Sequence, residues 1–184
     1  EESLQNLDSL NAISSGIDSV WIENPIISDN EVKGFIIGIL VNIPSIAETA
    51  TDTQQTNQAD GSQILNNDLS NLFFGILART RINNNPLANL PSANLTIAYN
   101  HIENISLIGI WGDIYWGTVT LMNNYIAHCG YIPRIKDFPE VEFPPNSAIS
   151  FSVKLGHLSI DSCRIVNTGL SRTGKVISTE DSEN

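Results

Sequence analysis

The 184-residue sequence predicts an all-β fold in which short parallel strands stack as a solenoid of about five coils. Two apolar patterns recur along the chain in a fixed order, and no segment has the periodicity of a helix. One repeat is too short to bury its own apolar edge. Stacked repeats bury equivalent residues in a continuous core, so the repeats are expected to stack.

The first pattern is an eight-residue unit, the octet, which predicts a strand, a corner and the start of the next strand. Positions one, three and eight are aliphatic, except for a serine at position one of the second copy, and positions one and three point to one side of a strand. Positions five and six favour turns or left-handed backbone, and stacked asparagines there are expected to hydrogen-bond to one another. The five copies begin at Val20, Ser62, Leu95, Val119 and Leu158.

The second pattern is a four-residue motif around a central isoleucine, which predicts another strand of each coil. In two copies this isoleucine precedes the octet by nine residues, Ile110 before Val119 and Ile149 before Leu158. A third strand then completes the coil, and GKVIS at Gly174 has the pattern of a strand in one more coil. The five copies are NAIS at Asn11, IGIL at Ile37, FGIL at Phe74, IGIW at Ile108 and SAIS at Ser147.

Long insertions separate some of these strands within a single predicted domain, residues 1–184. Residues 42–61 and 78–94 fall at the same place in successive coils, whereas residues 128–146 leave from another corner. Solenoids expose strand edges and need caps, but neither end has an amphipathic helix. We therefore expect that the domain belongs to a longer chain, or that a protein partner or another subunit covers its ends.

The repeat resembles the right-handed parallel β-helix of the pectate-lyase-like superfamily, from about Asn11 to Ser178. Coils of that fold carry three strands and often an asparagine ladder at the tight turn, which fits the Asn-Asn corners of the octets. The alternative is a sandwich or barrel of short antiparallel strands. Such a fold would not explain why the two patterns recur in a fixed order.

The resemblance directs the search for catalytic residues to the outer face of a sheet. Lyases and hydrolases of the superfamily place acids, Arg, Lys or His there. On the octet strand, Glu23 and Asp161 are three or more coils apart, too far for a catalytic carboxylate pair. We therefore predict no catalytic residue. The outward positions next to the central isoleucines, none of them titratable, are Ser14, Leu40, Leu77, Trp111 and Ser150.

Other chemistry finds little support in the sequence. RIK at Arg134 and GH at Gly156 match two motifs of polygalacturonase-type hydrolases, but in the opposite order and without an Asp-Asp pair. The histidines His101, His128 and His157 fall at different offsets from their octets, which places them on different faces. We predict no metal site and no cofactor.

Composition excludes some classes of partner. The chain has 9 basic and 20 acidic residues and a net charge of −11, so nucleic acids and anionic membranes are poor partners. No apolar run approaches the ~20 residues that span a bilayer. The two cysteines, Cys129 and Cys163, fall at different offsets from their octets and are expected to be buried thiols rather than a disulfide.

The clearest candidate for a ligand site is IWGDIYWG at Ile110, in the turn between two strands of one coil. Trp111, Tyr115 and Trp116 have flat faces that stack well on sugar rings, and Asp113 can accept hydroxyl protons. The alternative is that Tyr115 and Trp116 pack over the flank of the solenoid. If the third insertion folds over this sheet, it adds Arg134, Lys136 and Asp137.

These observations favour a non-catalytic structural or adhesive module of a larger extracellular or phage-like assembly, at a cell surface or on a virion, with carbohydrate binding near Trp111. The alternative is a polysaccharide lyase or glycoside hydrolase, in which residues of the third insertion meet Asp113. A third hypothesis is assembly through the outward residues Leu40 and Leu77. The predicted partners are a polysaccharide, further coils or a protein at the ends, and a second copy of the chain.

Overall fold

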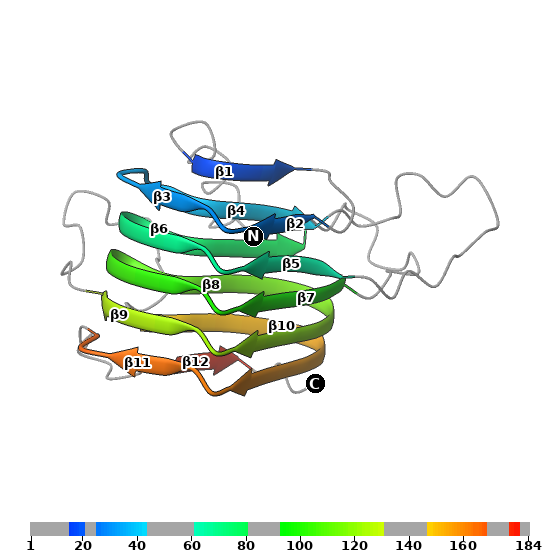
Figure 1. The fold of residues 1–184 in the computed structure, drawn as a ribbon. Coiled ribbons are helices and arrows are strands. Elements are labelled where there is room, and N and C mark those ends of the chain that lie inside the picture. Colours follow the sequence, from blue (N-terminus) through cyan, green and yellow to red (C-terminus); the bar gives the residue numbers. More distant parts are fainter. Residues whose placement is uncertain are drawn as a thin grey trace, which may run out of the picture.

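The computed structural model describes residues 15–20, 25–43, 61–80, 93–130, 147–168 and 177–180. Every regular element in these ranges is a strand, and every strand pairing is parallel (Figure 1), which confirms an all-β fold with parallel sheets. In this part of the chain no helix is long and apolar enough to cross a membrane. The strands are β1 (Ser15–Val20), β2 (Ile26–Ser28), β3 (Glu31–Lys33), β4 (Ile37–Ile43), β5 (Ser62–Leu65), β6 (Asp68–Thr80), β7 (Ala93–Ala98), β8 (His101–Met122), β9 (Tyr125–Cys129), β10 (Ser147–Asp161), β11 (Arg164–Val166) and β12 (Ile177–Glu180).

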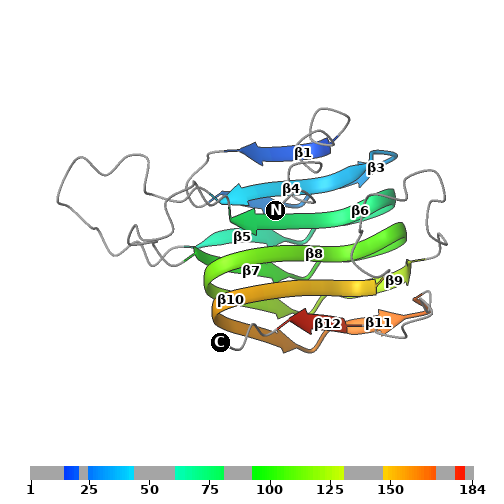
Figure 2. The same ribbon diagram turned by 180° about the vertical axis from the view of Figure 1, so that it is seen from behind.

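The strands form three rows that the chain visits in a fixed order. The isoleucine row contains β1, β4, β12, the second part of β6, the middle of β8 and the first part of β10. The octet row contains β2, β5, β7 and the ends of β8 and β10. The ladder row contains β3, β9, β11 and the beginnings of β6 and β8. Figure 2 shows the isoleucine row from the front, and Figure 1 shows the other two rows.

The strand registers confirm four of the five predicted octets. Ser62 lies beside Leu95, Leu95 beside Val119, and Val119 beside Leu158. Position one of each octet therefore stacks on position one of the next. The repeat seen in the sequence is a repeat of the structure over this part of the chain.

The first predicted octet is wrong. Ile27 of β2 lies beside Ile64 of β5, so this unit is PIISDNEV and starts at Pro25 rather than at Val20. Val20 belongs to β1, where it lies beside Asn42 of β4. The apolar residues at alternate positions from Val20 match the first half of the octet pattern. The correct copy matches less well because its position one is a proline.

The central isoleucines form one column, as the second pattern predicts. Ile177 of β12 continues the column, which confirms that GKVIS includes a strand. The first copy is wrong, because Ile17 of β1 lies beside the isoleucine of β4, and NAIS at Asn11 is outside the described residues. The other members of the column are Ile39, Ile76, Ile110 and Ile149.

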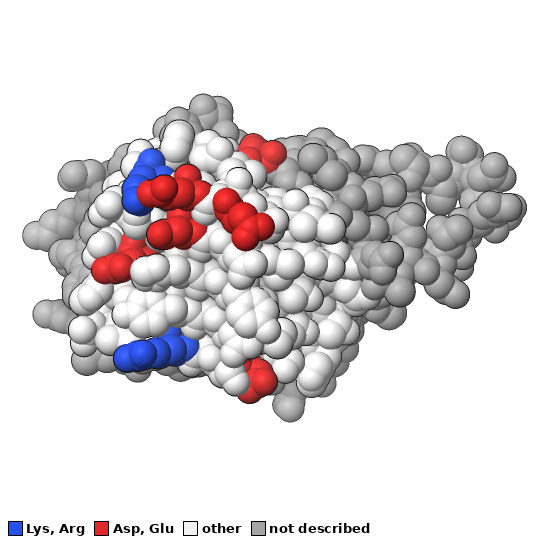
Figure 3. Space-filling model, in the orientation of Figure 1, with Lys and Arg blue, Asp and Glu red and all other residues white. Residues whose placement is uncertain are grey.

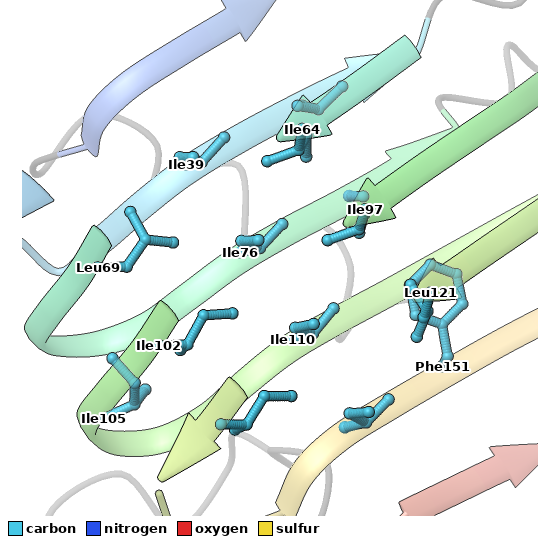
Figure 4. Packing of buried hydrophobic residues seen from close by; sticks show 14 of the residues in the cluster. Ile39, Ile64, Leu69, Ile76, Ile97, Ile102, Ile105, Ile110, Leu121 and Phe151 are labelled. Carbon is cyan, nitrogen blue, oxygen red and sulfur yellow. The ribbon is translucent and has the colours of Figure 1, made fainter. Parts of the chain in front are cut away.

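The inward side chains of the three rows share one core (Figure 4). Its central members are 0% exposed, and burying an aliphatic side chain of this size contributes about 1.5–3 kcal/mol. At the C-terminal end of the stack, Leu158, Ile160 and Ile165 pack against this core but are only half-buried. Figure 4 labels residues of all three rows: Ile39, Ile76 and Ile110 of the isoleucine row, Ile64, Ile97 and Leu121 of the octet row, and Leu69 and Ile102 of the ladder row.

A glycine precedes the central isoleucine in three neighbouring strands because the backbones approach closely there. A Cβ atom on Gly75 would lie 2.4 Å from the carbonyl oxygen of Gly109, and one on Gly38 would lie 2.6 Å from the carbonyl oxygen of Gly75. Both distances are far below van der Waals contact. The glycines of IGIL, FGIL and IGIW are therefore required by packing inside the stack.

Four asparagines form a ladder at the corner between the octet row and the ladder row, which confirms the predicted ladder. Nδ2 of Asn30 donates to Oδ1 of Asn67, Asn67 donates to Asn100 in the same way, and Asn100 donates to Asn124, at 2.9–3.0 Å. The backbone N–H groups of Asn30, Asn67 and Asn100 donate to the same oxygens. The ladder ends at Cys163, whose sulfur lies 3.8 Å from Nδ2 of Asn124.

The three predicted insertions lie mostly outside the described residues. Residues 44–60 and 81–92 both connect the isoleucine row to the octet row, and residues 131–146 connect the ladder row to the isoleucine row. Strands of all three rows extend slightly into the predicted insertions. The ladder corner is different, because only two residues separate the strands there in each described repeat.

Candidate functional site

Trp111, the first residue of the predicted ligand site, is half-buried on the outer face of the isoleucine row. It packs against a second apolar cluster, separate from the main core. Leu40 and Leu77 belong to this cluster and are 0% and 1% exposed, so they are not available for the predicted subunit contact. Strand alternation correctly predicts that both side chains point away from the main core. It does not predict that they are buried in a second cluster. The cluster consists of Ile37, Leu40, Phe74, Leu77, Leu107 and Ile108.

The other residues of the predicted site are only partly described. Asp113 is half-buried and lies in register between Arg79 and Ser152, on the same face as Trp111. The described part of the chain therefore brings together two of the seven predicted residues. Those outside the described residues, entirely or in their side chains, are Tyr115, Trp116, Arg134, Lys136 and Asp137.

A polar group surrounds Arg79 at one end of the isoleucine row. Nε of Arg79 donates to Oδ1 of Asn42 at 2.5 Å. Burial raises the pKa of the Asp18 carboxyl, while the positive charge of Arg79 and a hydrogen bond with Ser15 act in the opposite direction. Asp18 is exposed, and its charge has compensating partners in the chain, so we interpret this group as structural.

The ladder row carries a line of polar and aromatic side chains that was not predicted from the sequence. This line occupies position seven of every octet, and the residue of each octet lies in register with that of the next. The outward positions predicted from the sequence belong to the other two strand types. Figure 3 shows most of the acidic side chains of this face gathered toward its N-terminal end, with basic side-chain atoms beside them. We call this row the charged row: Glu31, Asp68, His101, Tyr125 and Arg164.

The charged row is held together by contacts among its own members and their neighbours. Nε2 of His101 lies 3.3 Å from Oε2 of Glu103, and the rings of His101 and Tyr125 meet edge to face at 4.9 Å. The guanidinium of Arg164 lies over the ring of Tyr125, 5.7 Å from its centre. Exposed contacts of this kind contribute little to stability. They do occupy the ring of Tyr125 and so leave it poorly placed to stack on a ligand.

Position five of the octets forms a second outward line, beside the charged row. All of its residues are exposed and left-handed, with φ between 52° and 60°. The N–H groups of the first four donate to carbonyl oxygens of the next coil at 3.1–3.2 Å, so the backbone is held in the same geometry each time. We call this line the corner column: Asp29, Asn66, Tyr99, Asn123 and Ser162.

Tyr99 is the exception in the corner column. Left-handed backbone is unfavourable by about 1–2 kcal/mol for residues with a Cβ atom, and Asn and Asp tolerate it best. The side chain of Tyr99 is 55% exposed, so burial does not compensate for its φ of 60°. Residues held in unfavourable geometry concentrate at functional sites. Tyr99 is therefore the best candidate for a ligand-binding residue, and its signal in the sequence is a tyrosine where other copies have Asn, Asp or Ser.

Cys129 is expected to be unreactive in the folded protein. Both cysteines are free thiols, and burial raises the pKa of Cys129 to about 12, against a smaller opposing effect of a hydrogen bond with the backbone of Ile105. Very little of this thiol is ionised at neutral pH, and the thiolate is the reactive form. In a Cys163→Ser variant, intact-mass measurement should show no maleimide adduct on the native protein and one adduct in denaturant. Equal labelling rates in the two conditions would contradict this.

The candidate site is thus the ring of Tyr99 between the exposed amides of Asn66 and Asn123. Among the described residues, no group of three or more His, Cys, Asp or Glu side chains is placed to hold a metal ion. In comparisons with known proteins, no family model, curated protein or solved structure matches this chain.

Proposed function

We propose that this chain is a right-handed parallel β-helix that binds a glycan at the corner column without catalysis. The observation that carries this proposal is Tyr99, an exposed aromatic ring in a left-handed position that favours asparagine. The binding residues differ from those that the sequence suggested near Trp111. The sequence-based prediction of weak carbohydrate binding is thus retained, at another corner of the fold.

The β-helix reading is supported by the order in which the chain visits the three rows. Each coil contributes one strand to each row, and each strand pairs in parallel with its equivalents in neighbouring coils. The asparagine ladder at a two-residue corner is what the pectate-lyase-like superfamily often has at the same place. These features favour a β-helix over a sandwich, whose neighbouring strands are antiparallel.

The chemistry of the corner column supports a glycan as the ligand. The ring of Tyr99 offers an apolar face to the C–H surface of a sugar. Asn66 and Asn123, the neighbours of Tyr99 in the column, are exposed, and each amide can both donate to and accept from hydroxyl groups. An aromatic platform between two amides is therefore suited to a sugar ring.

The end of the stack supports a place in a larger assembly. Leu158, Ile160 and Ile165 are half-buried, whereas Val119 and Leu121, one coil earlier, are 0% exposed. A further coil of the same chain, a partner or a second copy would bury these core residues. We therefore retain the structural or adhesive role in an extracellular, cell-surface or virion assembly as part of the proposal.

A Tyr99→Asn variant tests the proposal because it separates binding from folding. Asparagine suits φ of 60°, so the thermal midpoint should stay the same or rise, while glycan affinity should fall about tenfold or more, the loss of roughly 1.4 kcal/mol. Calorimetric titration with glycans selected on an array measures the affinity. Tyr99→Phe, which keeps the ring, is the matched control and should bind. Unchanged affinity in Tyr99→Asn, or no glycan bound by the wild type, would overturn the proposal.

The second candidate function is cleavage of a polysaccharide. The contact between His101 and Glu103 favours it, because an imidazole held by a carboxylate can act as a general base, and Tyr125 and Arg164 lie in the same row. Release of unsaturated or reducing ends from a glycan, abolished in His101→Ala but retained in Tyr99→Asn, would establish this function instead of the first.

A further inference from the structure

We infer that the glycan is an extended, uncharged, β-linked chain that lies along the corner column, parallel to the stack of coils. This inference rests on the proposed function and adds the class of ligand and its direction. The observations that carry it are the regular spacing of the corner column, the polar groups that it presents and the charges beside it.

The spacing of the corner column matches an extended sugar chain. Strands paired in a sheet lie ~4.8 Å apart, so each coil places one side chain at that interval. The interval is close to the length of one sugar unit in an extended β-(1→4)-linked chain. Since the five residues share φ between 52° and 60°, their side chains leave the backbone in the same direction. Successive sugars can therefore meet successive coils.

The order of groups in the column also fits such a chain. Tyr99 is central, and Asn66 and Asn123 flank it, with Asp29 and Ser162 at the two ends. A sugar stacked on Tyr99 would place the hydroxyl groups of its neighbours near the flanking amides. An α-(1→4)-linked chain coils, so its sugars leave a straight line within a few units and lose the outer contacts.

The charges beside the column exclude acidic glycans. Asp29 is itself in the column, and Glu31, Asp68 and Glu103 lie on the adjoining ladder row. Two basic side chains lie nearby: Lys33 on β3 forms an ion pair with Glu31, and Arg164 adjoins the last position. Because the net charge of the chain is −11, carboxylate or sulfate groups on a ligand would be repelled along most of the column. Neutral sugars do not experience this repulsion.

Oligosaccharides of defined length and linkage test the inference. Calorimetric titration with β-(1→4)-linked glucose and N-acetylglucosamine oligomers of one to six units is expected to show affinity rising about threefold or more per unit up to about five units, then a plateau. The α-(1→4)-linked glucose oligomers and oligogalacturonates should bind no more tightly than the corresponding monosaccharides. Asn66→Ala and Asn123→Ala should lower affinity for pentamers and leave disaccharide affinity within about twofold.

The outcomes separate this inference from the function on which it rests. Binding that requires Tyr99 but is independent of length, or is equal for α-linked or acidic oligomers, would overturn the inference and leave the proposed function in place. Failure of every glycan to bind would overturn the proposed function. An affinity for pentamers that Asn66→Ala and Asn123→Ala both leave unchanged would place the ligand away from the corner column and so contradict the inference.

Discussion

Replacing Ile110 by alanine is expected to lower the free energy of unfolding by about 2–5 kcal/mol. Ile110 is 0% exposed and lies between Ile76 and Ile149 in the isoleucine column. The parallel backbone pairings on both sides fix the distance between coils, so the stack cannot collapse into the cavity. Urea denaturation followed by circular dichroism measures the change.

The control for this variant is Ile26→Ala, which removes the same atoms at a position that is 67% exposed. It should change stability by less than about 0.5 kcal/mol. Ile110→Val, which removes one methylene, should cost about 0.5–1.5 kcal/mol. Equal losses for Ile110→Ala and Ile26→Ala would show that the isoleucine column is not a packed core.

Replacing Asn67 by aspartate should destabilise the protein by about 3–5 kcal/mol at neutral pH, the penalty for an uncompensated buried charge. Asn67 is 1% exposed, and its Nδ2 donates to the carbonyl oxygens of Ile27 and Leu65 and to Oδ1 of Asn100, at 2.9–3.0 Å. A carboxylate would place an oxygen against these three acceptors. Chemical denaturation at pH 7 measures the loss.

The control lies one residue earlier, because Asn66→Asp introduces the same charge at an exposed position where aspartate is tolerated. Its effect should be below about 0.5 kcal/mol. Burial raises the pKa of an aspartate at position 67 above its unfolded value of about 3.9, so the penalty develops as pH rises through that value and shrinks below it. A loss in Asn67→Asp that does not shrink in acid would point to a cause other than buried charge.

The sequence predicted the repeat well because octet positions one and three and the central isoleucine all face the core. It failed at the first coil for a local reason. Pro25 replaces the aliphatic residue at position one, and the alternation after Val20 offers a better apolar match five residues earlier. The hydrogen bonds of the ladder restrict which residues can occupy position six. Aligning the copies on that position would have identified Asn30 and with it the correct copy.

The candidate site was harder to predict than the fold. Apolar alternation gave the outward direction of Trp111 and Leu77, but it cannot show whether other parts of the chain cover an outward residue, and both pack in the second cluster. Position seven is part of the octet, but the sequence pattern alone did not show that its side chains form a row. The contact between His101 and Tyr125 in the structure shows this. The sequence indicated that Tyr99 is a corner residue, but only the structure shows that it is exposed.

The ladder corner has a consequence for engineering and for divergence of this fold. Two residues turn the chain there in each described coil, while the long segments 44–60, 81–92 and 131–146 all leave from the other two corners. Among the described residues, the side-chain bonds of the ladder join asparagines of neighbouring repeats. Lengthening, shortening or grafting a loop at the other corners is therefore expected to leave the ladder intact, and substitutions along the corner column are expected to change a ligand preference without redesign of the scaffold.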